Sequence, residues 1–330
     1  MNLFISQRGL SLIELMIGIL LGSLLLLGVL QIFQSNSDTL RMQNGFSRVQ
    51  ESGRFAVDML SKEIRQADFW GCAENKNIEN LSASADKFYS SIGGDDIGVA
   101  GQDNVATNTK VENIAVIEGT DVLTLSGAED ACAGEGRMLN GTDKGDIVVS
   151  DSCPIKNNDI VIVSNCKSGS VFTVTSTTET AGHKKLNYPA GIVFKEEYGV
   201  DSKILTPYEK VFFIASGAQN TNSLNTNSLF MRDEAGNVQE LVPGIDDMQV
   251  SYGVDTNGNG IVNQWQTAND VISMAEVTAI KIELLVSSDS VAGVDKQTIT
   301  RLDGSKKEYD DGLLRKLYVA TVKVRNRGSM

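Results

Sequence analysis

QRGLSLIELMIGILLGSLLLLGVLQIF, residues 7–33, is the stretch that decides the fold. No charged side chain occurs from Leu15 to Ser37, and a helix of this length spans about 34 Å, slightly more than the hydrocarbon core of a bilayer. No small-residue cleavage motif follows the apolar run, as it would in a removed signal peptide. The sequence therefore predicts one retained transmembrane helix. Because Arg8 precedes it and most of the chain follows, we expect a cytoplasmic N-terminus and an exported body.

Glu14 is a carboxylate inside the start of this apolar run. An uncompensated carboxylate in a bilayer costs on the order of 2.5–3.5 kcal/mol, so such a residue usually has a partner. Cleavage between Gly9 and Leu10 would place a new α-amine one helical turn away on the same face, where it and the helix dipole attract the carboxylate. This pair would tolerate burial in the membrane, or set the register between neighbouring helices. Alternatively, Glu14 lies at the cytoplasmic headgroups without a partner.

RGLSLIELMIG, residues 8–18, resembles the leader of type IV prepilins. The resemblance implies that residues 1–9 are removed by a prepilin peptidase and that Leu10 is N-methylated. It also implies that Glu14 pairs with the Leu10 amine of a neighbouring subunit during assembly.

Two further regions narrow the resemblance to the PilW family of minor pilins. VQESGRFAVDMLSKEIRQADFWGC, residues 49–72, resembles the segment that ends the long helix of that family. EVTAIKIELLVSS, residues 276–288, and LYVATVKVRNR, residues 317–327, resemble its two closing strands. The resemblance is weak in the middle of the chain.

We expect an α+β, pilin-like fold in which a long N-terminal helix packs on an antiparallel, β-rich head. The predicted parts are a transmembrane half (10–33) and an amphipathic half (34–70) of one helix, followed by an exported head (71–330). Apolar residues at steps of three and four mark the face of the helix that packs on the head: Met42, Phe46, Val49, Gly53, Ala56, Leu60, Ile64 and Ala67. Short apolar runs separated by Gly, Asn, Asp and Ser indicate strands in the head.

Two polar stretches of the head are predicted to be long loops. Residues 74–110 are rich in small and polar side chains, and we expect little regular structure there. Residues 216–228 form the second predicted loop. The basic residues near the end of the chain are interpreted as a solvated strand face: Arg315, Lys316, Lys323, Arg325 and Arg327.

The four cysteines of the head suggest two disulfides. An exported, oxidising location favours disulfides over a metal site, because there is no CxxC pair and the chain has one histidine. Four cysteines allow three pairings. On chain order alone we favour Cys72 with Cys132 and Cys153 with Cys166.

DTNGNGIVNQW, residues 255–265, contains a weak calcium-loop candidate. The spacing of an EF-hand loop would place its ligands at Asp255, Asn257, Asn259, the carbonyl of Ile261, and Asn263. Gln266 stands where that loop needs a bidentate acid, so an Asn-Gly turn is the favoured interpretation. Apart from this weak calcium candidate, we expect no cofactor.

The sequence offers little support for catalysis or nucleic-acid binding. The net charge of -13 argues against direct contact with nucleic acid. His183 lies in a polar, turn-like segment without a nucleophile motif, and the acidic pairs fall in expected loops. We therefore expect a protein that is not an enzyme.

The predicted function is that of a minor pilin in a membrane-anchored priming or tip complex that initiates type IV pilus assembly. The resemblance implies partners that include other minor pilins, the major pilin, a prepilin peptidase, the inner-membrane assembly platform and a tip adhesin. The expected location is the bacterial inner membrane and then the pilus surface at its tip, with roles in adhesion, twitching motility or DNA uptake. Two alternatives remain: a minor pseudopilin of a type II secretion system, and a surface-binding domain on an uncleaved signal anchor.

Overall fold

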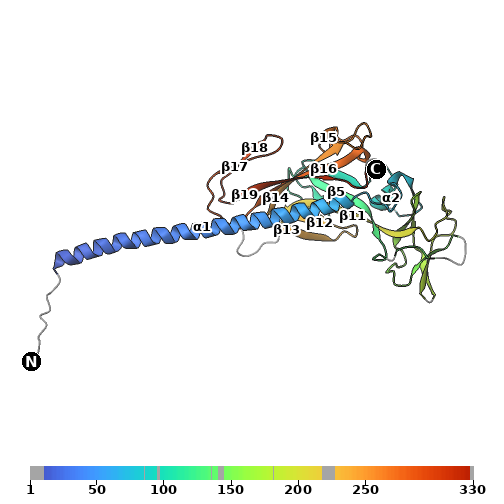
Figure 1. Ribbon diagram of the computed structural model, residues 1–330, viewed down its shortest axis with the longest axis horizontal. Helices are drawn as coiled ribbons and strands as arrows, with labels where there is room; N and C mark the ends of the chain where they lie inside the picture. The colour runs from blue at the N-terminus through green and yellow to red at the C-terminus, as the bar shows by residue number, and fades with distance from the viewer. Residues whose placement is uncertain are drawn as a thin grey trace, which may run out of the picture.

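A single long helix, α1 (Leu12–Gln66), organises the molecule. The structure is a computed structural model that describes residues 11–84, 86–94, 97–134, 136–139, 145–180, 182–217 and 227–327. The N-terminal half of α1 projects away from the head, and the C-terminal half packs on it (Figure 1). The α+β, pilin-like fold is confirmed. The helix begins two residues after the predicted start at residue 10 and ends four residues before the predicted end at residue 70.

The strands of the described residues form five sheets. The largest has eight strands: β1 (Ile78–Asn80), β8 (Gly169–Thr173), β7 (Ile160–Ser164), β11 (Lys203–Ser216), β12 (Asn227–Arg232) and β13 (Val238–Pro243), with β5 (Val122–Asp130) on β11 and β2 (Val99–Gln102) on β5. A four-stranded sheet has the order β15 (Gln264–Gln266), β14 (Ile245–Val254), β16 (Val277–Ser287) and β19 (Arg315–Lys323).

Three smaller sheets and three short helices complete the head. A three-stranded sheet has the order β6 (Ile147–Ser150), β10 (His183–Asn187) and β9 (Ser176–Thr180). The two hairpins pair β3 (Lys110–Val111) with β4 (Ile114–Ala115) and β17 (Gln297–Thr300) with β18 (Lys306–Tyr309). The helices are η1 (Asn75–Asn77), α2 (Lys87–Ser91) and η2 (Met274–Glu276). Within these sheets the strands pair antiparallel, except that β1 lies parallel to β8.

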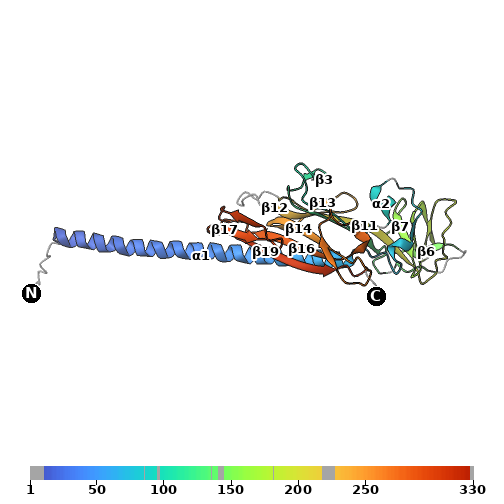
Figure 2. The same ribbon diagram turned by 90° about the horizontal axis from the view of Figure 1, so that it is seen from above.

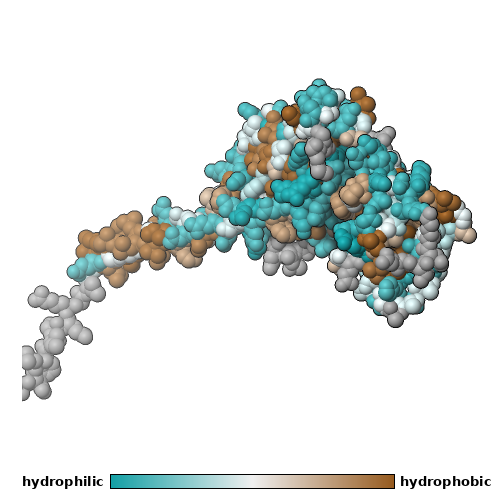
Figure 3. Space-filling view, turned by 45° about the vertical axis from the view of Figure 1, so that its right-hand side comes forward, coloured by the Kyte–Doolittle hydropathy of each residue, from teal (hydrophilic) through white to brown (hydrophobic). Residues whose placement is uncertain are grey.

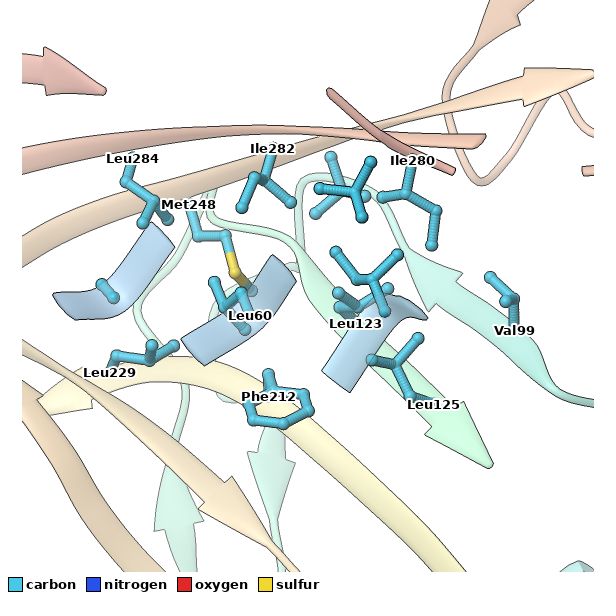
Figure 4. Close-up of a cluster of buried hydrophobic side chains, with 14 of the residues drawn as sticks. Leu60, Val99, Leu123, Leu125, Phe212, Leu229, Met248, Ile280, Ile282 and Leu284 are labelled. Atoms are coloured by element: carbon cyan, nitrogen blue, oxygen red, sulfur yellow. The ribbon is translucent and has the colours of Figure 1, made fainter. Parts of the chain in front are cut away.

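The main core encloses the second half of α1. The helix contacts β16 and β19 of the four-stranded sheet and β5 and β13 of the eight-stranded sheet. Figure 4 shows Leu60 between Phe212 and Leu229 on one side and Met248 and Ile282 on the other. Burial of such a side chain stabilises the fold by roughly 1.5–3 kcal/mol, so the helix is an integral part of the head.

Most of the predicted packing face is confirmed. The buried members are Val49, Gly53, Ala56, Leu60, Ile64 and Ala67. Met42 and Phe46 are exposed. Met42 lies before Gly45, where the helix first meets Ala292 and Ser288, and the ring of Phe46 has the Lys316 ammonium group above it.

A second core lies in the part of the head furthest from the N-terminus (Figure 2). We call residues 131–202 the distal lobe. Leu186 of β10 and Phe172 of β8 are fully buried in its core, and the rings of Tyr188 and Phe194 pack edge to face with Phe172. Sequence analysis did not separate this lobe from the rest of the head.

The polar stretch at 74–110 has more structure than predicted. It contains η1, β1, α2 and β2, and Phe88, Ile92 and Ile97 are buried in a cluster around Trp70. These apolar residues are separated from one another in the sequence and follow neither a helical nor a strand period. Their side chains nevertheless pack together in one buried cluster. Of the second predicted loop, residues 218–226 lie outside the described residues; Asn227 and Ser228 belong to β12.

Both disulfides form, but the favoured pairing is wrong. Cys72 pairs with Cys166, and Cys132 pairs with Cys153. The first bond joins the segment after α1 to the turn between β7 and β8, where Ser164 also donates to the carbonyl of Trp70 at 3.0 Å. The second bond lies in the core of the distal lobe. Chain order fails because the lobe folds back on itself before the chain returns to α1.

The two disulfides should contribute unequally to stability. Their sequence separations are 94 and 21, and the loop-entropy model gives about 4.5 kcal/mol and about 3 kcal/mol respectively. Replacing Cys72 and Cys166 by Ser should therefore cost more than replacing Cys132 and Cys153. Urea unfolding of the detergent-solubilised full chain measures both losses. An equal or reversed order would contradict this assignment.

Asp121 gives the head a predicted dependence on pH. Its carboxylate is buried and accepts the N–H of Asn104 at 2.8 Å and that of Val250 at 2.7 Å. Burial raises its pKa to about 6, against the opposing effect of the two N–H groups. The folded state thus holds a proton between about pH 4 and 6 that the unfolded state has lost, so stability should fall as the pH rises through this window.

This contribution amounts to up to about 3 kcal/mol, since one pKa unit corresponds to about 1.4 kcal/mol. Asp121→Asn should remove it, whereas Asp58→Asn, on the exposed face of α1, should not. The free energy of unfolding at pH 4 and pH 6.5 measures the slope, and an unchanged slope in Asp121→Asn would refute the assignment.

Candidate assembly surface

The N-terminal half of α1 presents an apolar surface that the head does not cover. Every large apolar residue between Leu12 and Phe33 is exposed. Figure 3 shows this part of the helix as a hydrophobic rod that projects from a more polar head. Among the described residues, α1 is the one helix long and apolar enough to cross a membrane. A surface of this size is unfavourable in water and requires lipid or other apolar helices around it.

Glu14 closes the first turn of this helix. Its Oε2 atom accepts the N–H of Ser11 at 3.1 Å, and its own N–H donates to the Ser11 hydroxyl at 3.2 Å. This reciprocal arrangement is a capping box. The carboxylate is therefore directed towards the chain that precedes the helix. Gly9 and Leu10 lie outside the described residues, so cleavage and the pairing of Glu14 with the Leu10 amine stay predictions.

The second half of α1 approaches the head closely at Gly53. A Cβ atom at this position would overlap the ring of Tyr318 on β19. Glycine is required here because the helix backbone and the tyrosine ring occupy the space of a side chain. The sequence placed Gly53 on the packing face but gave no indication of its partner.

The C-terminal end of α1 is held by the last described residues of the chain. We call Asp68, Asn326 and Arg327 the C-terminal clamp. The Asn326 side chain donates to the carbonyls of Gln66 and Ala67, at 3.4 and 2.9 Å, and so satisfies two groups left free at the helix end. Arg327 Nε donates to Asp68 Oδ2 at 2.6 Å.

Of the clamp residues, Arg327 is buried, Asp68 is half-buried and Asn326 is exposed. Asp68 Oδ1 accepts the indole N–H of Trp70 at 2.7 Å, and the Arg327 guanidinium also reaches the carbonyls of Ile97 and Met274. Burial raises the pKa of Asp68, and the nearby positive charge of Arg327 opposes that rise. An ion pair of this kind specifies one arrangement, because removing either partner leaves a buried charge.

The interpretation of the basic C-terminal residues as a solvated face is wrong for two of them. Arg327 and Arg315 are each 7% exposed. Arg315 Nε donates to Asp246 at 2.7 Å and its Nη1 donates to Asp311 at 2.7 Å. Asp311 lies four residues before Arg315, but Asp246 and Asp68 are distant in sequence from the arginines that they compensate, and a local charge pattern contains no signal for these two partners.

The calcium-loop candidate is a hydrogen-bonded turn in the structure. The Asp255 carboxylate accepts the N–H groups of Asn259 and Gly260 at 3.2 and 2.6 Å. The side-chain oxygens of Asn257, Asn259 and Asn263 each accept another backbone N–H of the loop. These contacts support the Asn-Gly turn, and calcium binding by the carbonyl of Ile261 and its neighbours stays a prediction.

No group of three or more His, Cys, Asp or Glu side chains suited to a metal occurs among the described residues. His183 begins β10 opposite Ser150 of β6 and is exposed. The surface that sets this molecule apart is therefore its helix.

The fold defines the class first: a pilin-like protein with a membrane-compatible helix that continues into a β-rich head. Residues 211–326 match the PilW family, described as type IV pilus-assembly protein W. This segment runs from the middle of β11 to the residue before Arg327, which is less than half of the chain, and it indicates a protein related to type IV pilus assembly. No curated protein and no solved structure matches the chain.

The clamp predicts a large loss of stability in Arg327→Met. The variant leaves the Asp68 carboxylate buried without its cation, which should cost about 3–5 kcal/mol. The matched control is Arg325→Met two residues away, where the side chain is exposed and the change should stay within about 0.5 kcal/mol.

Adding Asp68→Asn to Arg327→Met should recover part of the loss, because the unpaired charge is then gone. Urea unfolding of the four proteins, wild type included, measures these differences. Equal stability of the two arginine variants would contradict the clamp.

Proposed function

We propose that this protein is a minor pilin that joins the membrane-anchored complex that initiates type IV pilus assembly. The observation that carries the proposal is the unburied apolar half of α1, continuous with a half that is built into the head. A rigid rod of this form transmits the position of the head directly to the membrane segment. The match to the PilW family supports a role in pilus assembly.

In the proposed mechanism the protein acts by assembly. After removal of residues 1–9, the Leu10 amine would lie beside Glu14, whose carboxylate already accepts the N–H and the hydroxyl of Ser11 at the helix start. In an apolar bundle a positive amine and a carboxylate on neighbouring helices attract strongly, and they would fix the axial offset between subunits. A Cβ atom added at Gly18, Gly22 or Gly28 would meet no other atom within 4 Å, so these positions leave space for close packing of a neighbouring helix.

The partners in this proposal are other minor pilins, the major pilin, the prepilin peptidase, the assembly platform and a tip adhesin. The distal lobe would lie furthest from the membrane, at the end where a tip component or a surface would be met. Adhesion, twitching motility and DNA uptake are each compatible with such a position.

A minor pseudopilin of a type II secretion system is the second candidate, since that class shares the leader and the helix. The PilW match favours the pilus. Deleting the gene separates the two, because a pilin mutant loses piliation and a pseudopilin mutant loses exoprotein secretion.

Glu14→Ala should abolish incorporation while leaving membrane insertion intact, because it removes the partner of the amine and makes the segment more apolar. We expect at least about a tenfold loss of the protein from sheared filaments, the equivalent of one charged hydrogen bond of about 1.5 kcal/mol or more. Immunoblots of filaments and membranes measure both quantities.

Ser23→Ala is the matched control, since Ser23 donates only to the carbonyl of Leu20 within its own helix. Normal incorporation of Glu14→Ala would exclude the pairing mechanism.

A further inference from the structure

Among the described strands, none pairs with the outer edge of β19. β19 is the last strand of the four-stranded sheet and pairs with β16 on one side. At its two ends, Leu314 accepts the N–H of Ser288 and Val324 donates to Thr278, so even-numbered residues direct their backbone groups towards β16. In an antiparallel pair these directions alternate, so the odd-numbered residues direct theirs outward.

The backbone of Arg315 already forms two hydrogen bonds at this edge. The side-chain amide of Gln297 accepts the Arg315 N–H at 2.9 Å and donates to the Arg315 carbonyl at 2.7 Å. The amide thus reproduces the two bonds of a neighbouring strand. The next four outward residues have no such partner among the described residues: Leu317, Val319, Thr321 and Lys323. They extend over about 20 Å, enough for a short strand.

The edge carries a charge opposite to that of the protein. Three exposed cations flank it, Lys316, Lys323 and Arg325, and no carboxylate occurs from residue 315 to 325. The chain as a whole has a net charge of -13. Local positive potential on an acidic protein favours an acidic partner and selects against basic ones.

The position of β19 also restricts the partner. Tyr318 packs on Gly53 in the second half of α1. β19 therefore runs beside the part of the helix that follows the apolar segment, as Figures 1 and 2 both show. A neighbour anchored by a parallel helix, offset along the axis by about one helical turn, would present its own head beside this edge.

We propose that the outer edge of β19 accepts an extended, acidic strand from the head of a neighbouring pilin-like subunit. Backbone hydrogen bonds from the four outward residues would supply affinity, and the flanking cations would select the partner. The proposal rests on the proposed function, because it needs a neighbour held in the same membrane. Lysines also protect free strand edges from pairing. If the lysines of β19 have this protective role, the test below should detect no partner at the edge.

The test uses the full chain in cells with its own pilus system. A photo-crosslinking benzoylphenylalanine replaces Thr321 on the edge, and in a control it replaces Thr178 on exposed β9. Sheared filaments are digested, and the adduct is mapped by mass spectrometry. We expect an adduct from position 321 alone, on an extended segment with Asp or Glu side chains in another pilin-like chain.

Val319→Pro tests the backbone directly. This substitution removes an outward N–H for which the described residues provide no partner, and proline is tolerated at strand edges. Val319→Thr keeps that N–H and has a side chain of similar size. The adduct should fall about five- to tenfold in the proline variant, the effect of one lost hydrogen bond, and stay unchanged in the threonine variant. Thermal melting shows whether the proline variant is folded.

Charge reversal provides a second variant that does not depend on the proline. Lys323→Glu should reduce the adduct, and Lys167→Glu, on an exposed turn of the distal lobe, should not. An adduct to a second copy of this chain would overturn the proposed partner.

Filaments that contain the protein but give no adduct, or an adduct indifferent to both edge variants, would overturn the edge proposal and leave the pilus function standing. Absence of the protein from filaments would overturn both.

Discussion

The burial of the second half of α1 between two sheets is the interaction on which the rest of the structure depends. Leu60 and Ile64 are fully buried, and their contacts come from strands of both sheets. Without the helix these sheets would each expose an apolar face, so the head has no complete core of its own. The membrane segment and the head are consequently one mechanical unit, and a force applied to one reaches the other through a continuous helix.

Closure of this unit depends on residues from opposite ends of the sequence. Arg327 and Asp68 are 259 positions apart, yet their side chains meet at the point where α1 ends. Asn326 caps the helix end, because its side-chain amide donates hydrogen bonds to two carbonyls there. The segment after α1 and the last described residues of the chain therefore form one joint. The distal lobe is inserted between them and contributes its own core.

Sequence reasoning recovered the parts of the fold that depend on local periodicity. The three-to-four spacing of apolar residues identifies the packing face of α1 from Val49 onwards, and short apolar runs between turn residues identify the β-rich head. The cysteine content and the expected oxidising location predict two disulfides. The calcium-loop residues, Gly9, Leu10 and Glu14 are named by motif alone, and the motif supplies their spacing but no evidence of occupancy or cleavage.

The missed features all depend on contacts between distant segments. The disulfide between Cys72 and Cys166 requires the path of the distal lobe, which no local pattern reveals. Burial of Arg315 requires Asp246, a partner on another strand, and a run of basic residues reads as solvated until that partner is known. The free edge of β19 follows from strand order, and strand order is not a property of any one strand.

The central claim is that a processed helix carries this head into a filament. Mass spectrometry of the N-terminal peptide, taken from the protein in membranes and in sheared surface filaments, tests it most directly. The account predicts a peptide that begins at N-methylated Leu10 and is present in the filaments. An intact N-terminus at Met1, found only in membranes, would contradict it and favour a binding domain on a plain signal anchor.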